Sequence, residues 1–193
     1  MFRLLNAVLL LAFLQITVSA TSSEPVERLR AHVAVDLITG VPASDIAGHY
    51  SSKPKELGRS ALSGNDLYLF PDSSYLYLEW ADVEPPTIRD KGTWAFSAGT
   101  VRLTSDPEVT WDPDAERSYV AVHREARPRE ALLVGLSRAL PYFEEKANGD
   151  PNFMLLLVAK TRIESIGQKS AARVKAKLMR EAWRPEYFRS PQK

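Results

Sequence analysis

Two short strand-like runs joined by a strong turn signal constrain this chain more than any other feature. Asp66–Phe70 and Tyr75–Val83 alternate in side-chain character, and Pro71–Ser74 lies between them. Proline presets the backbone angle φ for a turn, and Asp and Ser side chains bond nearby backbone groups. The pattern therefore predicts a β-hairpin.

Further short runs follow at near-regular spacing, which is typical of an antiparallel meander. Ser97-Ala98-Gly99 predicts a second tight hairpin, since Gly99 can supply the positive φ that such loops need. No helical segments separate the runs, so alternating β–α units are disfavoured. The predicted strands are Ile46–Ser52, Asp66–Phe70, Tyr75–Val83, Thr93–Phe96, Thr100–Thr104, Ser118–His123, Ala131–Leu136 and Phe153–Thr161. We predict a mainly β fold over residues 46–161, an antiparallel up-and-down barrel or barrel-like meander, with a sandwich as the alternative.

The first twenty residues predict a secretory signal peptide. Arg3 precedes an apolar run, and Val18-Ser19-Ala20 is a good cleavage context. An uncleaved anchor is the alternative, but the apolar run is shorter than the roughly 20 residues that a spanning helix needs. The signal peptide predicts export. The chain has no Cys, which favours a bacterial envelope over eukaryotic secretion, where disulfides are usual. We therefore expect the periplasm as the first location and extracellular release as the second.

Residues 21–45 form a lead-in segment whose secondary structure the sequence leaves open. Within Pro25–Ile38, Val33, Val35 and Leu37 alternate as in a strand, whereas Val26, Leu29, Val33 and Leu37 fit one face of a helix. A short helix is as compatible with these residues as a strand.

Residues 162–193 predict a basic amphipathic helix and tail that complete the chain. Ile166, Val174 and Leu178 repeat at helical spacing, and Pro185 cannot continue the helix. Residues 160–193 contain ten basic and three acidic residues, whereas residues 21–159 contain fourteen and twenty-one. The near-neutral total thus hides two segments of opposite charge.

Two hypotheses account for this helix. In the favoured one, its apolar stripe docks on its own β domain and burial supplies the energy. In the other, it contacts an envelope protein partner or an anionic membrane surface. The contact residues would be Lys169, Arg173, Lys177, Arg180 and Trp183. Nucleic acid is not an expected partner of an exported chain.

One series of motifs resembles a known group of proteins. Gly48-His49-Tyr50, Leu67 to Tyr75 (LYLFPDSSY), Gly92-Thr93-Trp94 and Val101-Arg102-Leu103 follow in this order. The series resembles small exported bacterial β-proteins of lipocalin-like type, although in true lipocalins the G-x-W motif lies on the first strand. The resemblance implies a barrel and a small apolar ligand, and it supplies no catalytic residues.

Aromatic residues of the predicted strands are the candidate ligand contacts. In the first hairpin, Leu76, Leu78 and Trp80 point one way and Tyr75, Tyr77 and Glu79 the other. Tyr68 is expected on the face of Tyr75 and Tyr77. The candidates are Tyr68, Tyr75, Tyr77, Trp80 and Trp94. The alternative is that such aromatics only pack across strands and fill the barrel.

No catalytic constellation, cofactor motif or metal site is expected. His32, His49 and His123 lack metal-binding spacing. The acidic stretch Asp106–Glu116 is the best calcium candidate, but it lacks the EF-hand pattern and is better interpreted as a solvated loop. We therefore expect a non-enzymatic binding protein of the bacterial envelope. The alternative is a peripheral membrane or partner-docking protein that acts through its C-terminal helix.

Overall fold

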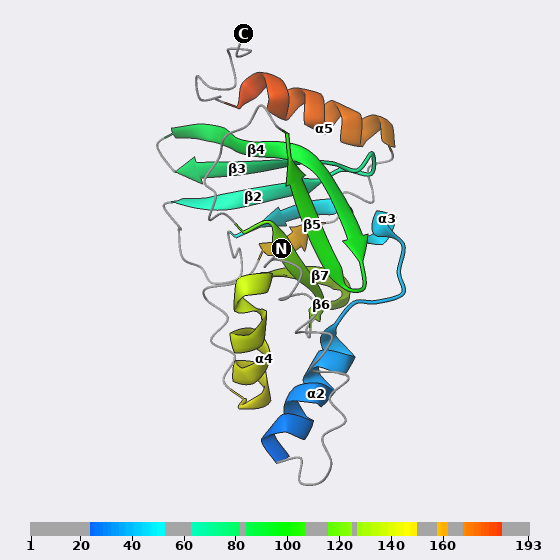
Figure 1. The fold of residues 1–193 in the computed structure, drawn as a ribbon. Coiled ribbons are helices and arrows are strands. Elements are labelled where there is room, and N and C mark those ends of the chain that lie inside the picture. Colours follow the sequence, from blue (N-terminus) through cyan, green and yellow to red (C-terminus); the bar gives the residue numbers. More distant parts are fainter. Residues whose placement is uncertain are drawn as a thin grey trace.

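The structure is a computed structural model that describes residues 24–52, 63–81, 84–106, 116–124, 127–149, 158–161 and 168–182. Eight strands in these residues form a closed antiparallel barrel in which each strand pairs with its neighbour in sequence (Figure 1). The last strand pairs with the first and closes the barrel. The strands are β1 Gly48–Ser51, β2 Ser63–Leu69, β3 Ser74–Ala81, β4 Glu84–Ser97, β5 Thr100–Ser105, β6 Ser118–Arg124, β7 Arg127–Gly135 and β8 Val158–Thr161. The predicted up-and-down barrel is thereby confirmed.

Both predicted hairpins are present, and local turn chemistry explains them. Between β2 and β3, the Asp72 carboxylate accepts a hydrogen bond of 3.0 Å from the backbone N–H of Ser74. Between β4 and β5, Ala98 and Gly99 both have positive φ, at 47° and 76°. Positive φ at both central residues defines the two-residue turn whose twist matches the flanking strands.

The strand register separates an inner from an outer face. Leu67 lies opposite Tyr77 and Leu69 opposite Tyr75, and all four side chains point into the barrel. Side chains of β1 to β7 and of the segment before β1 fill the interior between the strands. Its buried members are Ile38, Ile46, Ala47, Tyr50, Leu67, Leu69, Tyr75, Trp94, Val101, Leu103, Tyr119, Ala121, Ala131 and Leu133.

Helices cover two opposite sides of the barrel (Figure 1). Helix α5, Gln168–Glu181, lies across β2, β3 and β4 and packs on Phe70, Leu76, Leu78 and Ile88. Helices α2 (Glu24–Asp36) and α4 (Ala139–Ala147) pack together and against β6 and β7, and the 3-10 turn η2 (Leu136–Arg138) leads into α4. Lys146 of α4 forms an ion pair with the buried Asp36 of α2. The short helix α3, Ala43–Ile46, precedes β1.

The lead-in segment resolves the alternative that the sequence left open. Residues 24–36 form a helix, and Leu29, Val33 and Leu37 pack on the apolar cluster of β6, β7 and α4, whereas Val35 is 75% exposed. The strand-like alternation of Val33, Val35 and Leu37 is therefore coincidental. None of the helices in the described ranges is long and apolar enough to cross a membrane.

Several strand boundaries differ from prediction, and β2 and β7 begin three and four residues earlier, at Ser63 and Arg127. Strand β4 begins at Glu84, well before the predicted run at Thr93, and its register against β3 shifts twice. The second shift coincides with Pro85 and Pro86, since a bulge tolerates residues without an N–H. Ile46 ends α3 rather than beginning a strand. Of the predicted strand Phe153–Thr161, residues 153–157 lie outside the described residues.

Candidate functional site

The five aromatic residues predicted to contact a ligand lie on two different faces. Tyr75, Tyr77 and Trp94 point into the barrel. Tyr68 lies opposite Leu76 and Trp80 lies opposite Gly64, so both belong to the outer face. The expectation that Tyr68 shares a face with Tyr75 and Tyr77 is wrong, because the register pairs Tyr75 with Leu69.

The aromatic residues inside the barrel are engaged by the protein itself. The Trp94 indole Nε1 donates to the Phe70 carbonyl oxygen over 2.9 Å, and the Tyr50 hydroxyl donates to the Ile46 carbonyl oxygen over 2.6 Å. Tyr75 and Trp94 are 1% and 5% exposed. In the described residues this centre is a packed core.

A buried carboxylate interrupts the apolar interior. Asp90 is 1% exposed, and its Oδ2 accepts hydrogen bonds from the hydroxyls of Tyr75 and Ser105 over 2.7 and 2.8 Å. Its Oδ1 accepts from the backbone N–H of Lys91 over 2.8 Å. Burial, reinforced by Asp90, raises the pKa of Tyr75 far above its ordinary value, so the phenol stays protonated and remains a donor.

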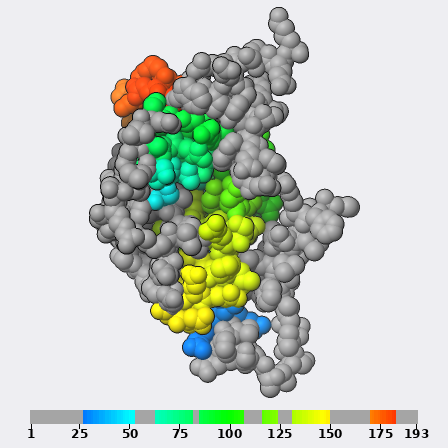
Figure 2. Space-filling model, turned by 90° about the vertical axis from the view of Figure 1, so that its left-hand side faces the viewer, coloured from blue at the N-terminus to red at the C-terminus, as the bar shows by residue number. Residues whose placement is uncertain are grey.

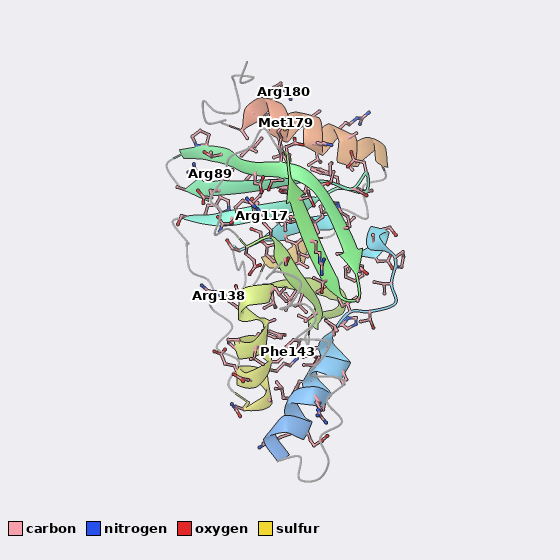
Figure 3. All side chains as sticks on the ribbon, viewed as in Figure 1. Arg89, Arg117, Arg138, Phe143, Met179 and Arg180 are labelled. Atoms are coloured by element: carbon pink, nitrogen blue, oxygen red, sulfur yellow. The ribbon has the colours of Figure 1, made fainter. Side chains whose placement is uncertain are left out.

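Arg117 carries an unusual polar atom near this carboxylate. Its positive charge opposes the rise in the pKa of Tyr75, and its Nε is buried without a hydrogen-bond partner in the described residues. Figure 3 shows Arg117 beside the middle of the barrel. A buried N–H without a partner is costly, so this atom is the least satisfied donor of the polar cluster.

A pocket of about 350 Å³ opens at one end of the barrel, where β2, β3 and β4 meet. We call it the mouth pocket. Its lining residues are Ser63, Gly64, Asn65, Glu79, Trp80, Ala81, Pro85, Thr87 and Arg89. Figure 3 shows Arg89 at this end, and Figure 2 views the molecule from the same side, with β2 to β4 between α5 above and α4 below.

One ion pair and one aromatic residue give the mouth pocket its character. Arg89 Nε donates to Glu79 Oε2 over 2.7 Å, and both side chains are about two-fifths exposed. The Trp80 ring covers Gly64 so closely that a Cβ on Gly64 would lie 2.2 Å from it. The pocket is therefore polar and balanced in charge, beside an aromatic residue that a tight contact with glycine holds in place.

The sequence analysis did not single out Arg89 or Asp90, because a bulge in β4 determines where these two side chains point. Tyr77 lies opposite Asp90 and Leu78 lies opposite Ile88, which leaves Arg89 as an extra residue. Strict alternation along β4 would point Ile88 and Asp90 the same way, yet Ile88 faces α5 and Asp90 faces inward. No local signal in the sequence indicates this bulge.

Helix α5 carries three of the five predicted contact residues on its outward face. Arg173, Lys177 and Arg180 are exposed, and Figure 3 shows Arg180 on the outer side of the helix and Met179 on the barrel side. Lys169 belongs to the same helix, and Trp183 and Ile166 lie outside the described residues. Val174 and Leu178 of the predicted apolar stripe pack on the barrel.

Lys175 differs from the other basic residues of α5. Its Nζ lies 3.1 Å from Asp72 Oδ2 and 2.6 Å from Ser74 Oγ, so it ties the helix to the β2–β3 turn. Burial opposes ionisation of Asp72, but hydrogen bonds from Ser74 and Lys175 outweigh it and lower the pKa of this carboxyl. Lys175 therefore holds α5 to its own barrel.

The outer face also brings together a histidine and a carboxylate that the sequence did not pair. His49 Nε2 lies 3.1 Å from Asp66 Oδ1, and the imidazole stacks on Tyr68 with ring centres 4.1 Å apart. The β1–β2 register creates this contact. In the described ranges, no three His, Asp or Glu side chains converge as metal ligands, and most of the acidic stretch 106–116 lies outside those ranges.

No protein-family model, curated protein or solved structure shows a significant similarity to this chain.

Proposed function

We propose that this chain is an exported, non-enzymatic binding protein that holds a small polar ligand in the mouth pocket. The observation that carries the proposal is the contrast between the packed centre of the barrel and the open pocket beside it. Buried side chains fill the centre, whereas a pocket of about 350 Å³ lies where β2, β3 and β4 meet and is lined by residues of both sheet faces. A small apolar ligand, which the sequence favoured, would have to displace that core.

The chemistry of the pocket supports a ligand without net charge. Glu79 and Arg89 neutralise each other, and Asn65, Ser63 and Thr87 add donors and acceptors. The volume lies at the lower end of the range of roughly 300–1,000 Å³ that is usual for small-molecule sites. A hydroxyl- or amide-rich molecule of a few hundred daltons matches both features.

Native mass spectrometry of the protein purified from its own envelope tests the proposal. We expect a bound mass that survives gentle ionisation and disappears in Asn65→Leu/Thr87→Val, which removes polar groups but leaves the Glu79–Arg89 pair. The double variant Arg28→Ala/Arg102→Ala, which changes two exposed residues that do not line the pocket, serves as the control and should retain the mass. Absence of any bound mass, or equal retention in both double variants, would contradict the proposal.

A further inference from the structure

Helix α5 separates its residues into two faces with different uses. Ala171, Val174, Leu178 and Ala182 repeat at intervals of three and four and pack on the barrel. Arg173, Lys177 and Arg180 repeat in the same way on the other side and are exposed. We call these three residues the basic face of α5. The two hypotheses drawn from the sequence therefore concern opposite faces of one helix.

The basic face is strongly cationic and little neutralised by its own chain. Helix α5 contains five basic residues and one acidic residue, Glu181. Lys177 Nζ lies 3.8 Å and Arg180 3.2 Å from Glu181, so one carboxylate is shared by two cations. Their side chains remain 67% and 71% exposed, and Arg173 has no ion-pair partner in the described residues.

We propose that the basic face of α5 binds the headgroups of anionic phospholipids. Charge complementarity supports this partner, because each basic residue near an anionic membrane raises the affinity about fivefold. The sequence that follows the helix supports lipid over an acidic protein. It places Trp183, Tyr187 and Phe188 among Arg184 and Arg189, which is the composition of a membrane-interface segment. This surface is separate from the mouth pocket and does not depend on a ligand there.

The docked apolar face determines the mode of binding. An amphipathic helix that inserts into a bilayer uses its apolar side. In α5 this side packs on the barrel, where Val174 and Leu178 belong to the same apolar cluster as Leu76 and Leu78. The described part of α5 therefore contributes only charge. Binding is peripheral and weakens steeply as salt screens the surface.

Vesicle co-sedimentation of the mature full chain tests this proposal. The probes are vesicles of phosphatidylcholine alone and vesicles with 30 mole per cent phosphatidylglycerol, at low and high salt. We expect binding only to the anionic vesicles and release at high salt. The variant Arg173→Glu/Lys177→Glu should bind at least roughly 30-fold more weakly, since two favourable charges are lost and two repulsive charges are added. Both replacements are good helix formers, and circular dichroism checks the fold.

A matched control separates the basic face from net charge. Arg28→Glu/Arg102→Glu changes the total charge equally, on α2 and β5, and should bind as the unaltered protein does. Equal loss in both double variants would overturn the assignment to α5. Binding to phosphatidylcholine alone, binding that is insensitive to salt, or no binding to either vesicle would overturn the lipid proposal, and the last result would leave an acidic protein as the partner.

Discussion

Besides Ser73, Ala98 is the only non-glycine residue of the described ranges with a positive φ. Its φ of 47° lies in the left-handed region, where a residue with a Cβ is disfavoured by roughly 1–2 kcal/mol. Asn tolerates this region better, and Asn-Gly is the preferred pair for this turn. We expect Ala98→Asn to raise the free energy of unfolding by about 0.5–1 kcal/mol in chemical denaturation. Ala98→Val should lower it instead, because β-branched residues avoid positive φ, and stabilisation by both would show that this turn is not strained at Ala98.

Individual residues also show which features the sequence predicts and which it does not. The turns at Pro71–Ser74 and Ala98-Gly99 can be predicted from the sequence, because the residues that bend the chain are adjacent. Asp90 and its donors Tyr75 and Ser105 come from three strands and meet only after β4 has taken up the extra residue Arg89. Turns are local and thus predictable, whereas this polar cluster depends on a register that no single run determines.

Helix α5 shows that the sequence can predict a helix without predicting the surface on which the helix packs. The spacing of Val174 and Leu178 indicates a helix, and the surface that covers them appears only with the outer face of β2 to β4. The competing strand and helix patterns of α2 illustrate the same limit, since the surface that covers Leu29 and Val33 is formed by α4, β6 and β7 together. Periodicity gives the apolar side of a helix but not the surface on which it packs.

Docking of α5 depends on a close approach at Ala171. This residue is 4% exposed within the helix–barrel contact, whereas its neighbour Ala172 is exposed. We expect Ala171→Asp to cost about 2 kcal/mol or more, because it buries a carboxylate without a partner. Hydrogen exchange should then show protection lost in α5 and retained in β6 and β7. Ala172→Asp adds the same charge in the same turn and should leave protection unchanged. Similar exchange in the two variants would contradict the docking described for α5.

The closed barrel depends on the short pairing of β8 with β1 and β7, which we call the seam. Strand β8 pairs with β1 at three positions and with β7 at two, so few residues connect the beginning of the sheet to its end. The β1–β8 pairing joins residues more than a hundred positions apart. Chains dominated by such pairs fold slowly, because the entropy of loop closure is lost before the pairing contacts form. The sequence predicted a strand here without its partners, since closure is a property of the complete sheet.

Ala159 is the point at which this seam can be broken with one change. It lies opposite Ser51 on one side and Leu132 on the other, so its N–H belongs to one of the two ladders. Ala159→Pro removes that N–H in a strand with two neighbours, where proline is not tolerated, and should cost roughly 2–4 kcal/mol. Amide protection should fall in β1 and β7 together, while the β2–β3 hairpin keeps its own. Ala159→Gly retains the N–H and should cost no more than about 1 kcal/mol. Because closure holds the ends of the barrel in register, a proline that leaves protection in β1 and β7 intact would mean that β8 does not close the sheet.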